Sequence, residues 1–215
     1  MAKPLLALIG LMILLLSVGC CTCGNLTFQK DRLRDYYQSG RYNREVSEVA
    51  DAAAHYIRKR VGTGTTDLAL VLDIDDTALS DWAYIDGVDF GFEKKQFDAW
   101  VENADAPAIE PVLQLYKDAK HLGIKVFFIT GRKEHLRSAT VQNLESAGYL
   151  RFDGLFMRPE GAAPESNVAY KSSVRRRLMV QGSVIIANVG DQNSDLEGGY
   201  SEQNFKLPNP FYYQH

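Results

Sequence analysis

The chain has 215 residues, of which 46% are hydrophobic and 24% are charged, which is enough apolar content for one sizeable core. Its net charge of −3 argues against a nucleic-acid polymer as a partner, because a polyanion is bound by clustered positive charge. All three cysteines (Cys20, Cys21 and Cys23) lie close to the N-terminus. The rest of the chain therefore has no disulfide, thiolate metal site or cysteine nucleophile.

The N-terminus has the pattern of an export signal. Lys3 precedes an apolar run over residues 5–18 that ends in small residues, which predicts a signal peptide over residues 1–19. The residues LSVGC resemble the bacterial lipobox, in which the cysteine, here Cys20, receives the lipid after cleavage. An ordinary cleaved signal or a single-span anchor are the alternatives. We expect an exported, periplasmic or cell-surface lipoprotein, anchored in the outer or cell membrane.

The chain then alternates between helical and strand patterns. Residues 20–40 are expected to be a linker, with a short helix within 25–42, and apolar spacing predicts a long helix over 42–61. The run at 68–72 has no polar residue, as expected of a strand covered on both faces. Later elements are a helix in 109–123, a strand at 124–130, a helix in 136–147, a short strand in 152–159, a helix in 170–182 and a strand in 183–191. This order predicts an α/β fold with a mainly parallel sheet.

The stretch 81–108 interrupts this alternation directly after the first strand. A long insertion at this position often forms a cap over a site. Most of its aromatic residues are expected to pack as a small satellite core. They are Trp82, Tyr84, Phe90, Phe92, Phe97 and Trp100.

Polar residues follow several of the predicted strands. Ligands of open α/β sheets bind beyond the carboxyl ends of the strands, so these side chains should meet there. They are Asp73 and Asp75 after the first strand, Thr130, Gly131 and Arg132 at the second, Lys171 on a helix, and Asp191 and Asp195 after the last. Carboxylates this close repel one another, and a divalent cation with oxygen ligands, most plausibly Mg²⁺, relieves that repulsion. A carboxylate can attack phosphorus, while a second carboxyl group donates a proton and a lysine and a hydroxyl hold the phosphate.

Four sequence motifs carry a resemblance to a known family. The segments DIDDT, FFITGR, AYKS and GDQNSD resemble the four motifs of the haloacid dehalogenase superfamily. The segments GRKEHLRSATVQNLESAGY and FKLPNPFYY resemble its subfamily IIIB acid phosphatases, which include bacterial lipoprotein acid phosphatases and plant vegetative storage proteins. The resemblance covers about residues 40–215. It implies a Rossmann-like parallel sheet flanked by helices in a domain over 41–215, with a small cap at about 81–108.

The resemblance also implies roles for individual residues. Asp73 matches the nucleophile, and Asp75 matches the general acid that later activates water. Thr130, Gly131 and Lys171 match the phosphate-binding group. The Mg²⁺ ligands would be the Asp73 carboxylate, the Asp75 backbone carbonyl, Asp191 and Asp195, the last either directly or through water or Lys171.

The resulting expectation is a Mg²⁺-dependent acid phosphatase that acts on small phosphate monoesters through an aspartyl-phosphate. Nucleoside 5′-monophosphates are candidate substrates, with Trp82, Tyr84 or Trp100 stacking on the base. Arg132 either contacts the substrate or pairs with a structural carboxylate. The alternative function is a degenerate surface or storage lipoprotein that binds ligands without turnover. The resemblance leaves a homodimer open.

Three nearby groups are expected to have no catalytic role. Asp76 is interpreted as a helix-capping or solvent-facing residue. The basic run 175–177 is interpreted as a solvated helix face, and His135 as a surface residue.

Overall fold

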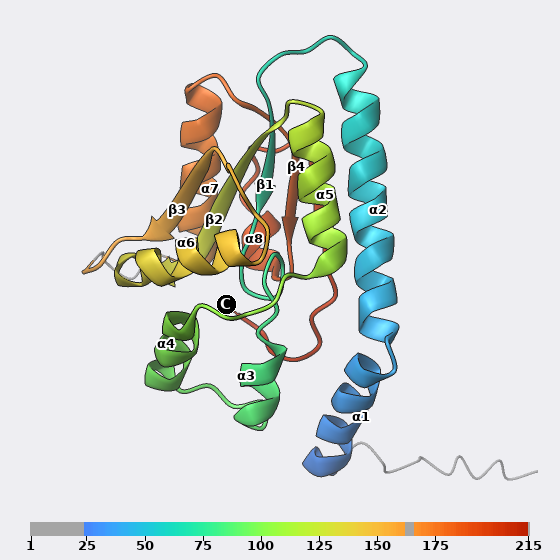
Figure 1. Ribbon diagram of the computed structural model, residues 1–215, viewed down its shortest axis with the longest axis vertical. Coiled ribbons are helices and arrows are strands. Elements are labelled where there is room, and N and C mark those ends of the chain that lie inside the picture. The colour runs from blue at the N-terminus through green and yellow to red at the C-terminus, as the bar shows by residue number, and fades with distance from the viewer. Residues whose placement is uncertain (1–23, 162–165, 215) are drawn as a thin grey trace, which may run out of the picture.

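The computed structural model describes residues 24–161 and 166–214 (Figure 1). The predicted signal peptide and Cys20 lie outside the described residues. In the part of the chain that is described, no helix combines the length and the hydropathy needed to cross a membrane.

A five-stranded sheet, with the order β3-β2-β1-β4-β5, forms the centre of the molecule. Every neighbouring pair is parallel, which confirms the predicted α/β fold. The strands are β1 (Leu68–Leu72), β2 (Lys125–Lys133), β3 (Gly154–Arg158), β4 (Val184–Gly190) and β5 (Gln203–Lys206). The edge strand β5 was not predicted, and β2 runs three residues further than expected.

Helices cover both faces of the sheet (Figure 1). Leu70 and Leu72 of β1 belong to the main core, which includes residues of α2 and α5, whereas Ala69 and Val71 pack with residues of α7. This alternation follows from the two-residue period of a strand and explains why the whole of β1 is apolar. The larger helices are α2 (Arg41–Val61), α5 (Glu110–His121), α6 (Arg137–Ser146) and α7 (Asn167–Val180).

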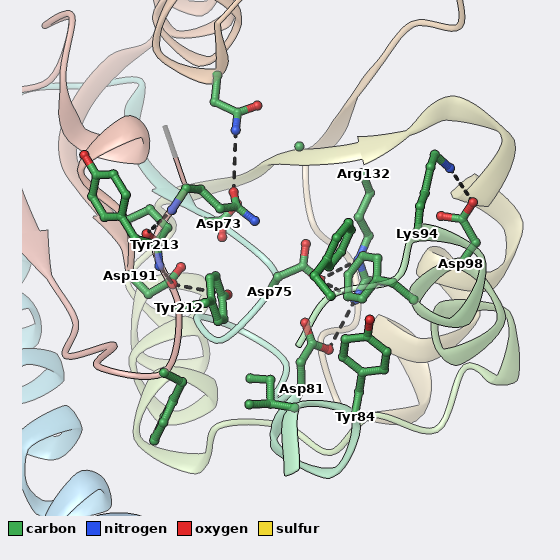
Figure 2. Close-up of a pocket in the computed structure, with 18 of the residues that line it drawn as sticks. Asp73, Asp75, Asp81, Tyr84, Lys94, Asp98, Arg132, Asp191, Tyr212 and Tyr213 are labelled. Atoms are coloured by element: carbon green, nitrogen blue, oxygen red, sulfur yellow. Dashed lines mark hydrogen bonds and ion pairs between the residues drawn. The ribbon is translucent and has the colours of Figure 1, made fainter. Parts of the chain in front are cut away.

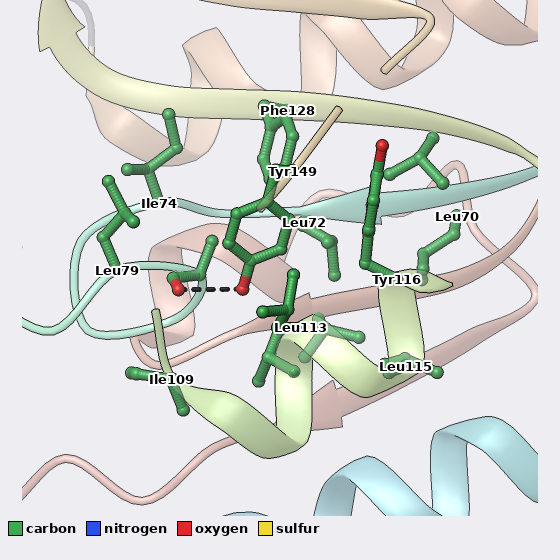
Figure 3. Packing of buried hydrophobic residues seen from close by; sticks show 14 of the residues in the cluster. Leu70, Leu72, Ile74, Leu79, Ile109, Leu113, Leu115, Tyr116, Phe128 and Tyr149 are labelled. Carbon is green, nitrogen blue, oxygen red and sulfur yellow. Dashed lines mark hydrogen bonds between the residues drawn. The ribbon is translucent and has the colours of Figure 1, made fainter. Parts of the chain in front are cut away.

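The main core extends up to the carboxyl end of β1 (Figure 3). Tyr149 is fully buried, and its hydroxyl donates a hydrogen bond to the carbonyl of Ala78 at 2.9 Å. The carbonyl of Ile74 accepts hydrogen bonds from the backbone N–H groups of residues 77–79. The turn after β1 is therefore held both by its own backbone and by a core side chain, which fixes where Asp73 and Asp75 leave the strand.

The segment 81–108 contains α3 (Trp82–Gly87) and α4 (Lys94–Asn103), which lie beyond the carboxyl ends of the strands (Figure 1). The short helix expected near the N-terminus is α1 (Leu26–Gln38), and it contacts this cap. Arg34 of α1 forms ion pairs with Asp86 at 2.7 Å and Asp89 at 2.8 Å. The helix thus closes the outer side of the cap.

Candidate active site

The predicted strand-end residues meet at one cavity of about 480 Å³ (Figure 2). Its polar lining includes Asp73, Asp75, Gly131, Arg132, Lys171 and Asp191. Two predicted residues, Thr130 and Asp195, are buried but are not among the lining residues. Lys171, which was expected to open its helix, lies one turn inside α7 and reaches the cavity from there.

On one side of the cavity floor, Lys171 bridges two carboxylates. Its Nζ lies 2.5 Å from Oδ1 of Asp73 and 2.5 Å from Oδ1 of Asp195, and all three side chains are buried. Burial and the charge of Asp195 raise the pKa of Asp73 well above its ordinary value, against the opposing effect of Lys171. Burial disfavours the charge of Lys171, but Asp195 and Asp73 outweigh it and raise the pKa of the lysine. The ammonium group therefore stays protonated and holds the two acids together.

Asp191 adds a third carboxylate on the same side. Carboxylate oxygens of Asp73, Asp191 and Asp195 lie within 4.8 Å of one another. Burial, together with the charge of Asp195, raises the pKa of Asp191 to about 6. Three acids share one lysine here, and a hard divalent cation would compensate the remaining negative charge. This all-oxygen donor set fits Mg²⁺.

The geometry of Asp195 favours an indirect role. Its Oδ1 accepts from Lys171, and its Oδ2 accepts from the backbone N–H of Gln192 at 2.8 Å. Both oxygens are thus already engaged by the protein. The carboxylate lies so close to the end of β4 that a Cβ at Gly190 would be 2.4 Å from the Asp195 Cβ. Only glycine fits at position 190. This tight packing supports a role in which Asp195 holds Lys171 and the loop after β4 in place.

Arg132 occupies the opposite side of the floor. Its Nε and Nη2 each lie 2.8 Å from Oδ1 of Asp75, and its Nη1 donates to Oγ1 of Thr140 at 3.2 Å. Burial alone would raise the pKa of Asp75, but Arg132 lowers it below its ordinary value. Arg132 thus pairs with the predicted general acid and not with a structural carboxylate, and it also lines the cavity, so the substrate contact stays a prediction. Thr130 joins the same group, because its Oγ1 lies 3.5 Å from Oδ2 of Asp75.

The interpretation of Asp76 as solvent-facing was wrong, although its carboxylate does bind the backbone at the residue that precedes α3. It is 1% exposed, and its Oδ1 accepts a hydrogen bond from the backbone N–H of Asp81 at 3.0 Å. Its φ of 50° lies in the left-handed region, which aspartate tolerates better than most residues. Burial and the charge of Asp191 raise the pKa of Asp76 to about 8. The unusual backbone turn directs this side chain inward.

Sequence reasoning missed Asp81, which is buried and lines the cavity. Its Oδ1 accepts from the indole Nε1 of Trp100 at 2.9 Å. The same oxygen lies 3.9 Å from Nη2 of Arg132 (Figure 2). Burial and the charges of Asp75 and Asp76 raise its pKa well above the ordinary value. No local pattern distinguishes Asp81 from a surface acid, because its environment comes from α4 and β2.

Trp82 and Trp100, two of the expected substrate contacts, are not among the residues that line the cavity. The face of Trp82 is occupied by Tyr37 of α1, with ring centroids 4.0 Å apart and planes at 7°. Tyr84 does line the cavity, although its hydroxyl is engaged by the backbone of Glu93. The aromatic lining consists of Tyr84, Phe90, Phe92 and Phe97 from the cap and Phe211, Tyr212 and Tyr213 from the C-terminal segment.

The basic run 175–177 was predicted correctly at only two positions. Arg176 and Arg177 are exposed, but Arg175 is fully buried. Its guanidinium donates to the backbone carbonyls of Asp195, Glu197 and Gly199. Arg175 therefore holds the loop after β4 in place. The prediction for His135 was right, since it is an exposed residue that pairs with Glu160 at 2.6 Å.

Paired aspartates after the central strand, a buried lysine and a second acidic loop define a phosphoryl-transfer site on a parallel α/β sheet. A sequence model of the haloacid dehalogenase superfamily, subfamily IIIB (acid phosphatase), matches residues 27–215, and the chain belongs to this family. It is accordingly a phosphomonoester hydrolase. The match begins within α1, so this helix is part of the family domain.

Comparisons with individual proteins agree with this assignment. The chain is 38% identical to acid phosphatase 1 of Solanum lycopersicum over 188 residues, covering 85% of the chain and 73% of that protein. It is 33% identical to vegetative storage protein 2 of Arabidopsis thaliana, covering 86% and 71%. The class C acid phosphatase of Bacillus anthracis has a similar fold, with a TM-score of 0.72, 23% identity and coverage of 87% and 86%.

Proposed function

We propose that the chain is a Mg²⁺-dependent phosphomonoesterase in which Asp73 forms an aspartyl-phosphate intermediate. The observation that carries the proposal is the buried group of Asp73, Lys171 and Asp191 on the floor of the cavity, with Asp195 paired to Lys171 but outside the lining. A buried excess of carboxylates is costly unless it is compensated. A bound cation compensates it, and the anionic substrate can then approach.

In the first step, an oxygen of the Asp73 carboxylate attacks the phosphorus of the monoester. The bond from phosphorus to the ester oxygen breaks, and the leaving alcohol takes a proton from the carboxyl group of Asp75. Lys171 holds Asp73 in position and stays protonated throughout. When Mg²⁺ is bound by Asp73, Asp191 and the carbonyl of Asp75, it supplies positive charge that offsets the repulsion between phosphate and carboxylate.

The pairing with Arg132 bears directly on the proton transfer. Because Arg132 lowers the pKa of Asp75, this residue is a carboxylate in the free protein at neutral pH. The negative charge of a bound phosphate raises the pKa again, and an acidic medium supplies the proton. In the second step, Asp75 as a carboxylate accepts a proton from water. The water oxygen bonds to phosphorus, the bond to Asp73 breaks, and inorganic phosphate is released.

The aromatic walls favour an aromatic leaving group. Phe92 and Phe97 of the cap and Tyr213 of the C-terminal segment line the same cavity as the catalytic floor. A nucleobase presents a flat apolar face that such rings bind well. We therefore propose nucleoside 5′-monophosphates as one substrate class. A phosphate-release screen over nucleotides, sugar phosphates and phosphorylated amino acids tests this, and equal rates on all three would contradict it.

The catalytic assignment is tested by turnover of p-nitrophenyl phosphate with Mg²⁺. We expect Asp73→Asn to lower kcat at least about 1,000-fold, which corresponds to about 4 kcal/mol of activation free energy. The wild type treated with EDTA should be inactive until Mg²⁺ is restored. Near-normal turnover by Asp73→Asn would exclude Asp73 as the nucleophile. A wild-type protein without metal-dependent phosphate release would instead be the ligand-binding or storage protein that the sequence left open.

We also propose that the chain is exported and anchored in a membrane through a lipid on Cys20. The support is the LSVGC pattern that follows the apolar run. Metabolic labelling with a fatty acid should mark the wild type and leave Cys20→Ser unlabelled. Equal labelling of both proteins would contradict the anchor.

A further inference from the structure

The C-terminal segment 206–214 packs against Asp191, one of the proposed metal ligands, and Figure 2 shows Tyr212 of this segment beside it. Nδ2 of Asn209 donates to Oδ2 of Asp191 at 2.6 Å, and the hydroxyl of Tyr212 lies 3.4 Å from the same oxygen. Nζ of Lys206 donates to the backbone carbonyl of Asp191. The segment thus contacts both the side chain and the backbone of this residue.

A second connection runs through Gln192. Nε2 of Gln192 donates to Oδ2 of Asp191 at 2.6 Å, while its Oε1 accepts from the backbone N–H of Gln214 at 3.1 Å. The last described residue therefore orients the amide that binds Asp191. A direct contact and a relayed contact from one segment converge on a single oxygen.

The two oxygens of Asp191 are engaged very differently. Three donors meet Oδ2, namely Gln192, Asn209 and Tyr212. Oδ1 accepts from the hydroxyl of Thr77 at a longer 3.2 Å. A carboxylate whose one oxygen is saturated by N–H donors presents the other oxygen to a cation, and such supporting donors orient metal ligands in proteins generally.

The orientation of the Asn209 amide is set by its own turn. Its Oδ1 accepts from the backbone N–H of Phe211 at 2.9 Å and of Tyr212 at 3.4 Å, which leaves Nδ2 to face Asp191. Asn209 therefore links the fold of the segment to the carboxylate. The residues that follow it also form part of the cavity wall.

We infer that Asn209 is a positioning residue that, with Gln192, orients Asp191 so that Oδ1 is the oxygen offered to the divalent cation. The C-terminal segment would then be required for metal affinity as well as for the shape of the substrate cavity. This inference rests on the proposed metal-dependent function. The inference goes beyond that function because it assigns metal affinity to Asn209, which is not among the residues that line the cavity and acts through Asp191.

Binding of Mn²⁺ to the full-length protein, followed by the electron paramagnetic resonance of the free ion, tests the inference without an activity readout. Asn209→Ala removes both amide functions. Asn209→Ser keeps a side-chain oxygen for the turn but has no group that reaches Asp191. We expect both variants to bind Mn²⁺ about 10- to 100-fold more weakly, the usual effect of losing such a supporting donor.

Two further variants and a stability measurement separate positioning from folding. Gln203→Ala removes an exposed amide from β5 and should leave the dissociation constant unchanged. Tyr212→Phe keeps the ring and should weaken binding less than the Asn209 variants do, because its hydroxyl contact is the longest of the three. The metal-free melting temperature of Asn209→Ser should fall less than that of Asn209→Ala. If Asn209→Ala does not fold, the Mn²⁺ affinity of Tyr212→Phe still tests whether the donors to Oδ2 of Asp191 support metal binding.

The possible outcomes discriminate between the two proposals. Wild-type affinity in both Asn209 variants, with normal binding by the wild type, overturns the positioning role alone. Failure of the wild type and of Gln203→Ala to bind Mn²⁺ or Mg²⁺ overturns the proposed metal dependence and the positioning role together. Weaker binding in both Asn209 variants, with Gln203→Ala unchanged, supports the inference.

Discussion

The two sides of the cavity floor carry acids in opposite electrostatic settings. On one side, Asp75 and Asp81 face the buried guanidinium of Arg132. On the other side, Lys171 pairs with Asp73 and Asp195, and Asp191 lies within reach of both carboxylates. On the first side the pKa of Asp75 is lowered and that of Asp81 is raised, whereas on the second side the pKa values of Asp73 and Asp191 are both raised.

This difference indicates what each side is built to do. The ion pair of Arg132 and Asp75 needs no further charge and can hold a proton-transfer group in a fixed orientation. An unbalanced group of acids is costly in a protein interior and becomes favourable only with an added cation. The fold thus separates a proton-transfer side from a metal and phosphate side, although both begin at the end of the same strand.

The largest expected effect on stability comes from removing the positively charged side chain of each side in turn. Lys171→Met and Arg132→Met each leave buried carboxylates without their partner, which lowers the free energy of unfolding by about 3–5 kcal/mol. Mg²⁺ should restore much of the stability of Lys171→Met, because it binds Asp73 and adds positive charge to the same group of acids, but little of that of Arg132→Met. Urea unfolding with EDTA and with Mg²⁺ measures both. An equal response to Mg²⁺ would contradict the separation of the two sides.

A smaller effect is expected from the pH dependence of Asp76. Its pKa is raised by burial and by Asp191 to about 8 in the folded protein, so between about pH 5 and 7 the folded state keeps a proton that the unfolded state has released. The free energy of unfolding should therefore fall with rising pH by up to about 1.4 kcal/mol per unit from this group. Asp76→Asn, which does not titrate, should lack that contribution.

The measurement is the difference in unfolding free energy between wild type and Asp76→Asn at pH 5 and pH 7, in EDTA. Taking this difference cancels the titrating groups that do not interact with Asp76. The free energy of unfolding of Asp76→Asn should increase relative to that of the wild type as the pH rises. A difference that is the same at both pH values would show that Asp76 does not retain its proton.

The smallest effect concerns the aromatic residues. Phe92 is exposed and lines the cavity, so Phe92→Ala should raise KM for an aryl phosphate or a nucleotide several-fold, in line with about 0.5–1.5 kcal/mol for one ring contact. The matched control is Trp82→Phe, which alters a ring that stacks on Tyr37 and does not itself line the cavity; it should leave KM unchanged. A larger change in KM for Trp82→Phe than for Phe92→Ala would reverse the assignment.

The sequence was most informative where one local rule was enough. The apolar run before Asp73 defines a strand covered on both faces, and the strand-end rule then brings Asp73, Asp75 and Asp191 together. The full strand order could not be predicted from the sequence, because β5 is short and has no apolar alternation. The position of the aromatic C-terminal segment in the cavity wall has no local sequence signal either.

The wrong predictions depend on partners that are distant in the chain or, at Asp76, on a local backbone conformation that the residue type does not reveal. Arg175 looks like its exposed neighbours, and its burial follows from backbone carbonyls of the loop after β4. Trp82 looks like a substrate platform until α1 brings Tyr37 against it. Asp76 looks like a surface acid until its left-handed backbone turns it inward. Composition and periodicity contain no record of such contacts.

The most direct test of the account is a rapid-quench experiment with a substrate labelled at its phosphate. Acid denaturation during turnover with Mg²⁺ should leave label on the wild type, because an acyl phosphate survives the quench. The label should be absent from Asp73→Asn and from wild type quenched in EDTA. Label retained by Asp73→Asn, or none on an actively turning-over wild type, would contradict Asp73 as the nucleophile on the metal side of the floor.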